Sequence, residues 1–230
     1  MGNLEFEKQY KEKGLSAQRR YPNEALIQFL ASHYFYLSPA TRKKIRVLEI
    51  GCESGANLWM VAKEGFSSFG IDIAPTGIKY CKEALKKWGV KSRLSVGNMK
   101  KLNFNDGYFD IIFDIVSMQH VDISGHMESL KETFRCLKKG GRFFQWHLGT
   151  NSTSFADGGG KHIDRFTLDN IKNPNVPLAG NGLTCFLTPA LAEKMLRSVG
   201  FKNIEIEIYS RTYKKRRQKI EYSAIQAQKI

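Results

Sequence analysis

The stretch VLEIGCESGANLWMVAKEG, residues 47–65, decides the fold. An apolar run carrying the acid Glu49 leads into a turn with Gly51 and Gly55, and a helical pattern follows the turn. A strand, a glycine turn and a helix in this order form the first unit of a doubly wound parallel sheet, which binds ligands at the carboxyl edge of its strands. Glycine lets the backbone approach a ligand closely, so this turn is the first candidate for a binding site.

The alternation of strands and helices continues to residue 148. Apolar, strand-like runs occupy residues 46–50, 67–72, 92–96, 109–117 and 141–148. Helical spacing of apolar residues predicts two helices that end at glycines, namely 75–88 before Gly89, and 122–138 before Gly140 and Gly141. This alternation predicts a parallel sheet, and the near-continuously apolar runs 47–50 and 111–116 are typical of its central strands.

The flanking segments are expected to complete a single domain, residues 1–230. Residues 22–37 predict a helix with Pro22 in its first turn, and we interpret residues 1–44 as a helical cap over the sheet edge. Residues 148–187 are rich in Gly, Pro and Asn, and we interpret them as a substrate-side insertion, because a loop this long is usually functional or mobile. The remaining predicted elements are a helix at 188–199 and strands at 201–209 and 220–228.

Composition is that of an ordinary globular protein, with 42% hydrophobic and 25% charged residues among 230. The net charge of +14 would suit a polyanionic partner if it covered one face. Instead, much of it falls in two local clusters: Arg42, Lys43, Lys44 and Arg46, and Arg211, Lys214, Lys215, Arg216, Arg217 and Lys219. Such clusters are more often solvated turns than binding sites.

The cysteines indicate neither a metal site nor a redox motif. Cys52, Cys81, Cys136 and Cys185 form no close pair in the sequence, so we expect no bound metal and four buried thiols in a reducing compartment. The N-terminus lacks the apolar core of a signal peptide, and no apolar run is long enough for a membrane span. We therefore expect a cytoplasmic protein with no membrane partner.

Two later strand ends carry residues suited to a nucleotide-like cofactor. Asp72 closes the second strand about 20 residues after the glycine turn, where a carboxylate can accept both ribose hydroxyls. After the third strand, in VGNMKKL, the Asn98 amide and the Met99 backbone could face an adenine ring. These positions add weight to the glycine turn, which alone is weak support for a cofactor site.

The order VLEIGCESG, FGIDIA, VGNM, FDIIFDIVSMQHV, LKKGGRFF resembles the class I S-adenosylmethionine-dependent methyltransferases of bacteria, over most of the chain. The resemblance implies a Rossmann-like α/β fold: a mostly parallel seven-stranded sheet with helices on both faces and an antiparallel C-terminal strand. It also implies S-adenosylmethionine as cofactor. Its methionine part would lie at Glu49, Gly51 and Gly55, its ribose at Asp72 and its adenine at Asn98. The neighbours Cys52, Ile73, Met99 and Asp114 complete the expected cofactor site.

One position departs from the family pattern. The usual loop is acid-x-Gly-x-Gly-x-Gly, and Glu53 replaces the middle glycine. Glu53 adds bulk and negative charge beside the expected methionine carboxylate. It could point to solvent, or it could pair with a positive charge of the cofactor.

The candidate catalytic residues are two histidines. His120 follows the fourth strand in SMQHV, and His147 ends the fifth in FFQWHLG. Either could take a proton from a hydroxyl acceptor near neutral pH, although His120 could equally be a hydrogen-bonding residue at a helix start. For an amine acceptor, Asp114 could orient the nucleophile. His162 and Asp164, in the insertion, could touch substrate or belong to an ordinary surface loop.

The favoured hypothesis is a small-molecule methyltransferase whose acceptor pocket lies under residues 15–37 and 148–187. The sequence DIVSMQHV stands where amide and nucleobase N-methyltransferases carry NPPY-like motifs, and it is similar to the small-molecule branch. The alternatives are an RNA or protein methyltransferase guided by the basic clusters, and a catalytically silent methyltransferase-like binding protein. A nicotinamide-dependent reductase fits the loop poorly, because Gly-x-x-x-Gly after an acid is not Gly-x-Gly-x-x-Gly. The sequence does not name the acceptor or the oligomeric state.

Overall fold

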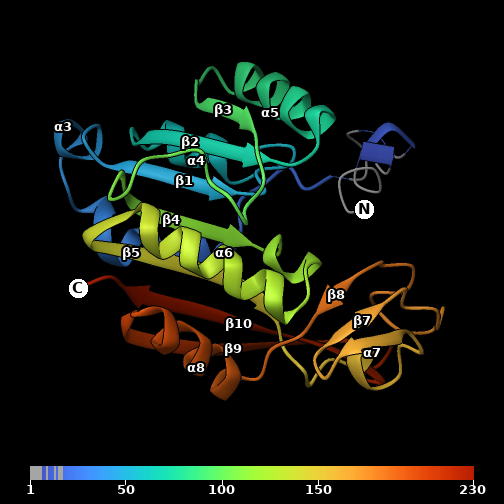
Figure 1. Cartoon of the computed structure of the whole chain (residues 1–230). Helices are drawn as coiled ribbons and strands as arrows, with labels where there is room; N and C mark the ends of the chain where they lie inside the picture. Colours follow the sequence, from blue (N-terminus) through green and yellow to red (C-terminus); the bar gives the residue numbers. More distant parts are fainter. Residues whose placement is uncertain (1–6, 9, 13, 15–17) are drawn as a thin grey trace.

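The computed structural model of the chain describes residues 7–8, 10–12, 14 and 18–230 (Figure 1). Its centre is a seven-stranded sheet in the order β3-β2-β1-β4-β5-β10-β9. The strands are β1 (Arg46–Ile50), β2 (Ser67–Asp72), β3 (Arg93–Val96), β4 (Phe109–Ile115), β5 (Leu137–Leu148), β9 (Lys202–Tyr213) and β10 (Gln218–Gln228). Strands β1 to β5 pair in parallel, whereas β10 is antiparallel to both of its neighbours. The predicted fold class, with its reversed C-terminal strand, is confirmed.

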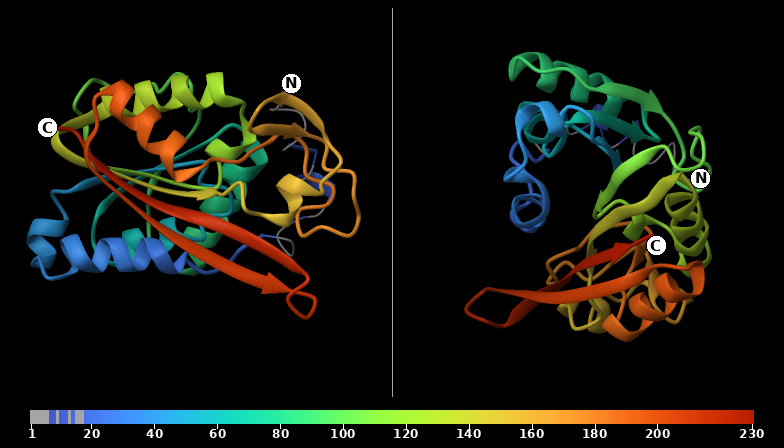
Figure 2. Two further views of the ribbon diagram at one scale, coloured as in Figure 1. Left: turned by 90° about the horizontal axis from the view of Figure 1, so that it is seen from below. Right: turned by 90° about the vertical axis from the view of Figure 1, so that its left-hand side faces the viewer.

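Helices cover both faces of this sheet (Figure 2). They are α2 (Glu24–Leu30), α3 (Pro39–Arg42), α4 (Leu58–Lys63), α5 (Pro75–Lys87), α6 (Ile123–Cys136) and α8 (Pro189–Val199). Alternate residues of a strand point to opposite faces. Accordingly Leu48 and Phe143 pack with α6 and α8, whereas Val47 and Phe144 pack with α2 and α4. The apolar runs at 47–50 and 111–116 are central strands, as predicted.

The fifth strand begins earlier than predicted. Helix α6 ends at Cys136, and β5 starts at Leu137, which is fully buried and pairs with Phe109 of β4. Gly140 and Gly141 therefore lie within β5, and the prediction that they stop the preceding helix is wrong. Backbone hydrogen bonds with Lys229 hold both glycines beside the C-terminal end of the chain. This long-range pairing leaves no periodic signal in the local sequence.

The predicted helix at 22–37 is divided in two and lies on a face of the sheet. Helix α2 begins after Asn23, whose side chain accepts a hydrogen bond from the backbone N–H of Leu26. Residues 31–35 continue it as a π-helical turn, η2 (Ala31–Phe35). Phe29 stacks on Phe144 of β5 with 4.9 Å between ring centroids, so the prediction that this helix packs over the sheet edge is wrong. Pro22 precedes the N-cap instead of lying in the first turn.

The glycine-rich insertion is an ordered substructure at the carboxyl edge of the parallel strands (Figure 1). It contains α7 (Thr153–Ala156) and a three-stranded antiparallel sheet of β6 (Lys161–Asp164), β7 (Thr167–Asp169) and β8 (Thr184–Cys185). Leu168, Ile171 and Phe186 form its own core together with Leu148 at the end of β5. None of the helices in the described part of the chain is long and apolar enough to cross a membrane.

Candidate functional site

The glycine turn after β1 lies against the turn after β4. Gly51 has a φ of +66°, which favours glycine, and a Cβ at this position would collide with the side chain of Ser117. Ser117 follows β4, and its hydroxyl donates a 3.3 Å hydrogen bond to the carbonyl of Gly51. Gly55 has a φ of +77°, and a Cβ there would lie 2.8 Å from the sulfur of Cys81. Both glycines of the predicted motif are therefore required by the local geometry.

Glu49 is a buried acid beneath this turn, with only 2% of its surface exposed. Its Oε1 atom accepts a 2.6 Å hydrogen bond from Nδ2 of Asn57, the residue before α4. Its Oε2 atom is buried without any hydrogen-bond partner among the described residues. Burial raises the pKa of Glu49 to about 8. A buried carboxyl with a free oxygen is suited to receive a donor or cation from a bound molecule.

Asp72, at the end of β2, reaches the same turn. Its Oδ2 atom accepts a 2.9 Å hydrogen bond from the N–H of Glu53, and its Oδ1 atom accepts a 2.8 Å bond from the N–H of Ala74. Burial raises the pKa of Asp72, and only 5% of the residue is exposed. Tyr10, from the N-terminal segment, lies near it: the Tyr10 ring and the Asp72 carboxyl are both 3.2 Å from the point where a Cβ of Gly77 would stand.

Glu53, the departure from the family pattern, has a left-handed backbone with a φ of +42°. Its side chain is 35% exposed, and its Oε2 atom lies 3.8 Å from the guanidinium of Arg19. The N-terminal segment contacts the turn a second time, because Ser54 donates a hydrogen bond to the Arg19 carbonyl. The negative charge of Glu53 is therefore offset by a residue of the chain itself.

The residues expected to face an adenine lie beyond β3 and after Asp72. Asn98 is exposed, and its Oδ1 atom accepts a hydrogen bond from the N–H of Lys100. It lines a cavity of about 250 Å³ together with residues of β3 and of the segment 101–104. Ile73 and Met99 are half-buried, and the thiol of Cys52 is buried near Cys81. The structure brings the turn, Asp72 and Ile73 together and places Asn98 at the next strand end.

Asp114 is fully buried within β4 and organises the turn that follows it. Its Oδ1 atom accepts hydrogen bonds from the N–H groups of Ser117 and Met118, at 2.9 and 3.1 Å. Its Oδ2 atom accepts a 3.2 Å bond from the side chain of Gln145 on β5. Burial raises the pKa of Asp114 to about 6. Through Ser117, this carboxyl positions the wall of the glycine turn.

The two candidate catalytic histidines have different surroundings. His120, in the short helix η3 (Met118–His120), is half-buried, and its Nδ1 atom hydrogen-bonds the carbonyl of Leu183 in the insertion at 3.1 Å. Burial lowers its pKa. His147 is fully buried at the end of β5, and its Nδ1 atom donates to the carbonyl of Leu148. Burial lowers the pKa of His147 to about 4.

Asp164 and His162, both on β6, have different surroundings in the structure. Asp164 accepts hydrogen bonds from the N–H groups of Ile123 and Phe166, so it ties the insertion to the start of α6. His162 is exposed on β6. Asp164 thus has a structural role that its position in a polar loop does not indicate.

Several residues of the site carry no signal in the sequence. Asn57, Ser117 and Gln145 each contact a predicted residue from another element, and Tyr10 of the N-terminal segment lies near Asp72. Of these residues, only Asn57 could be predicted from the sequence to contact Glu49, because it lies at the start of the helix that follows the first strand. The other contacts depend on the packing of separate elements.

The two basic clusters lie far apart. Arg42 pairs with Glu64, and Arg46 packs over the ring of Tyr108, at the amino ends of the strands. The second cluster occupies the exposed tip of the β9–β10 hairpin, which projects from the body of the molecule (Figure 2). The clusters therefore do not form one continuous basic face.

Comparison with known proteins finds similarity to methyltransferases in both sequence and fold. Residues 47–141 match the family model of the methyltransferase domain. A sterol 24-C-methyltransferase of Neurospora crassa is 26% identical over 206 residues, which cover 82% of this chain and 48% of the relative. The chain thus spans about half the length of that relative.

Solved structures agree with the fold. An S-adenosylmethionine-dependent methyltransferase of Methanosarcina mazei superposes with a TM-score of 0.68 at 21% identity, covering 84% of this chain and 98% of that one. The 1,6-didemethyltoxoflavin-N1-methyltransferase of Burkholderia thailandensis, solved with its substrate and S-adenosylhomocysteine, gives a TM-score of 0.67 at 16% identity. That superposition covers 99% of this chain and 86% of the other. The resemblance expected from the motifs is confirmed.

Proposed function

We propose that this chain, whose residues 47–141 match the family model of the methyltransferase domain, transfers a methyl group from S-adenosylmethionine to an oxygen or nitrogen of a small-molecule acceptor. The observation that carries the proposal is the carboxyl of Glu49, buried under the glycine turn with one oxygen unpartnered. A protein rarely keeps such an oxygen unless a ligand satisfies it.

The residues present fit this cofactor. The backbone at Gly51 can approach a ligand because no side chain stands there, and the free Oε2 of Glu49 is suited to a donor from a cationic amino acid. Each oxygen of Asp72 accepts one backbone N–H and retains a lone pair, so it can also accept a ribose hydroxyl. Asn98 is exposed, and although its Oδ1 atom accepts a hydrogen bond from Lys100, its amide NH₂ group could meet the edge of a purine. Arg19 offsets part of the charge of Glu53, which lowers the repulsion between Glu53 and the cofactor's carboxylate.

The bound cofactor would supply a methyl group on a sulfonium, which has a good leaving group. The chain's own task is then to hold an acceptor in line with that methyl and to exclude water. The turn after β4, fixed by Asp114, and the insertion over it form the acceptor side in this proposal.

A hydroxyl acceptor must lose its proton during transfer. Of the two histidines, His120 is the better candidate for general base, because it is half-buried beside the insertion, whereas His147 is fully buried. His147 is fully buried, and its lowered pKa makes it a weak base. An amine acceptor would need no base if it bound in its neutral form.

The alternatives receive less support. Guidance of RNA by both basic clusters is disfavoured, because one cluster lies at the amino ends of the strands and only the hairpin cluster lies near the carboxyl edge. The alternative of a catalytically silent binding protein rests on the replacement of the middle glycine by Glu53. The ion pair of Glu53 with Arg19 weakens that argument. We also propose the cytoplasm as the location, which suits four free, buried cysteines.

Calorimetric titration with S-adenosylmethionine and S-adenosylhomocysteine tests the proposal. The native chain should bind with a micromolar dissociation constant, and Asp72→Ala should weaken binding about 100-fold because two charge-assisted hydrogen bonds are lost. Asp169→Ala, at the end of β7 in the insertion, is the matched control and should bind normally. Release of S-adenosylhomocysteine should then be measured with panels of phenols, amines and tRNA. No binding by the native chain, together with binding by Glu53→Gly, would establish the silent alternative.

A further inference from the structure

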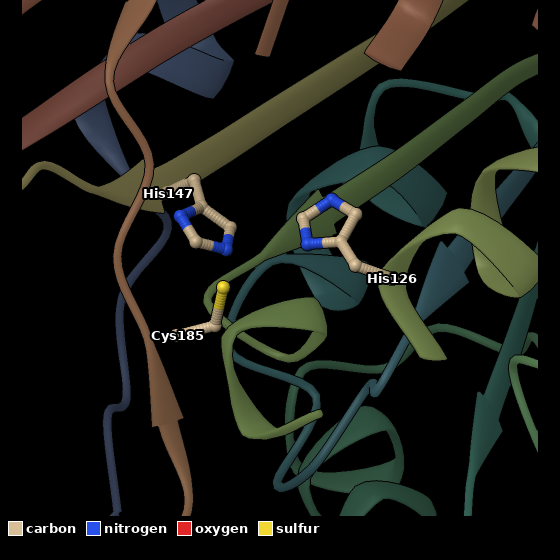
Figure 3. A group of neighbouring side chains, drawn as sticks. All are labelled: His126, His147 and Cys185. Atoms are coloured by element: carbon tan, nitrogen blue, oxygen red, sulfur yellow. The ribbon is translucent and has the colours of Figure 1, made fainter. Parts of the chain in front are cut away.

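Three metal-ligating side chains from separate elements meet in the core behind the acceptor side. His126 comes from α6, His147 from β5 and Cys185 from β8 of the insertion (Figure 3). All three residues are buried, and one ligand atom of each lies within 4.8 Å of those of the other two. Among the described residues this is the group of histidine, cysteine and acidic side chains that could hold a metal ion.

The inner atoms of the two histidines lack partners. Nδ1 of His126 and Nε2 of His147 are buried without a hydrogen bond. Figure 3 shows both nitrogens and the sulfur of Cys185 pointing into the same space. Two unpaired imidazole nitrogens in a dry core are costly unless something binds them.

The outer atoms of the same residues are held in place. Nδ1 of His147 donates a 3.0 Å hydrogen bond to the carbonyl of Leu148, which leaves the lone pair of a neutral ring on Nε2. Nε2 of His126 lies 3.1 Å from the amide of Gln145, and the backbone of Cys185 is held by its pairing with Thr167 of β7. Partners behind the ligands that fix their orientation are typical of protein metal sites.

We propose that His126, His147 and Cys185 bind a zinc ion. One thiolate and two imidazoles are ligands that zinc prefers, and they leave one tetrahedral position for a water molecule. Tetrahedral zinc needs ligand atoms about 3.3–3.6 Å apart, so the three side chains would close by about 1 Å on binding. The Cys185 thiol loses its proton as the Zn–S bond forms, and that proton passes to solvent.

His126 sets one further requirement. Zinc on Nδ1 needs the ring proton on Nε2, so the Gln145 amide must turn its oxygen toward that atom. The oxygen would then also face Asp114, which can donate to it when protonated. The cysteines are far apart in the sequence, and this spacing predicted no metal site. The folding of β8 against β5 and α6 brings the three ligands together.

The site would join the insertion to the main sheet. Cys185 belongs to the small sheet, whereas His147 belongs to β5 of the main sheet and His126 to helix α6. This inference does not depend on methyl transfer. It also removes His147 from the candidate bases, because its lone pair would be bound to the metal.

Metal binding by the full chain, purified without a metal-affinity step, tests the proposal. Elemental analysis after dialysis against Zn²⁺ and then buffer should find one equivalent per chain. Titration of the metal-free chain with Co²⁺ should produce the near-ultraviolet charge-transfer band of a cobalt-bound thiolate, and Zn²⁺ should raise the melting temperature. Cys185→Ser should lose the band, and His126→Gln should weaken Co²⁺ binding at least tenfold.

Cys136→Ser is the matched control, because Cys136 is an equally buried free thiol outside the cluster, and it should retain the band. X-ray absorption of the zinc-loaded native chain covers the case in which a variant does not fold, and should show one sulfur and two imidazole ligands. Less than a tenth of an equivalent of tightly held zinc, a band that survives in Cys185→Ser, or ligation without sulfur would each overturn the proposal.

Discussion

The Oε1 atom of Glu49 accepts a 2.6 Å hydrogen bond from Nδ2 of Asn57, and this pair joins the first strand to the start of helix α4. Oδ1 of Asn57 in turn accepts a 2.9 Å bond from the N–H of Asn23, the N-cap of α2. The acid at the centre of the candidate cofactor site thus also anchors the N-terminal helix. The second oxygen, Oε2, has no hydrogen-bond partner among the described residues, which leaves it available to a ligand.

We expect Glu49→Gln to stabilise the ligand-free protein at high pH. The pKa of Glu49 is raised from 4.5 to about 8 in the folded chain, so the unfolded chain loses this proton first, and stability falls as the pH rises from about 4.5 to about 8. Each unit of pKa difference corresponds to ~1.4 kcal/mol. Urea unfolding should therefore show that Glu49→Gln changes the free energy of unfolding by about 2–4 kcal/mol more in the stabilising direction at pH 8.5 than at pH 4.5.

Cofactor binding supplies the second readout for this variant. Glutamine keeps an oxygen for Asn57 but cannot ionise when a cationic ligand binds, so affinity for S-adenosylmethionine should fall at least tenfold. Equal stability differences at both pH values would show that Glu49 is ionised without cost in the folded chain.

Gly51→Ala should abolish cofactor binding and destabilise the fold. The added Cβ would collide with the side chain of Ser117, which carries the turn after β4. Gly89→Ala is the matched control, because Gly89 has a φ of +69° against +66° for Gly51 but open space around it. Both variants share the ~1 kcal/mol cost of a left-handed alanine, so the excess measured by thermal unfolding for Gly51→Ala isolates the collision. Equal losses in the two variants would contradict this reading of the turn.

The sheet could be predicted because its signals are local. The runs 46–50, 67–72 and 109–117 are apolar and end in turns, and they became β1, β2 and β4 with ends shifted by at most two residues. The failures lie where distant segments decide the structure. Leu137 belongs to β5 and not to the helix, because its segment pairs with Phe109 and with the C-terminal end of the chain. No local sequence pattern indicates that pairing.

In the candidate site, too, the residues at strand ends could be predicted, whereas the contacts between distant segments could not. Glu49, Gly51 and Asp72 each lie at or beside the carboxyl end of a strand, so their meeting at one edge follows from the parallel topology. Asp114 was placed near the pocket, but its role in holding the turn through Ser117 required the structure. The meeting of His126 with Cys185 depends on how the insertion folds back, which the composition of residues 148–187 does not encode.

We expect Glu53→Gly to raise cofactor affinity without loss of stability. The left-handed backbone of Glu53, with a φ of +42°, destabilises the folded chain by about 1 kcal/mol relative to glycine at the same position. The exposed ion pair with Arg19 contributes at most about 1 kcal/mol in return. Calorimetry should show S-adenosylmethionine binding tightened several-fold, and urea unfolding should show a change within about 1 kcal/mol.

Glu53→Gln separates charge from backbone conformation. It keeps the side chain and the left-handed φ but removes the negative charge. Affinity gained equally in both variants would assign the effect to charge, whereas a gain in Glu53→Gly alone would assign it to the backbone. Weaker binding in both would mean that Glu53 pairs with a positive charge of the cofactor.

Neutralising the hairpin tip should leave small-molecule methylation intact. Lys214, Lys215, Arg216 and Arg217 are exposed, and the first three have left-handed backbones. Asparagine tolerates that conformation, so changing all four to Asn should preserve the fold. We expect turnover with a small acceptor within twofold of the native chain, and loss of weak, salt-sensitive RNA binding. Lys43→Asn with Lys44→Asn, at the opposite edge of the sheet, is the control. A tRNA methylation activity that disappeared only in the hairpin variant would instead favour the RNA methyltransferase.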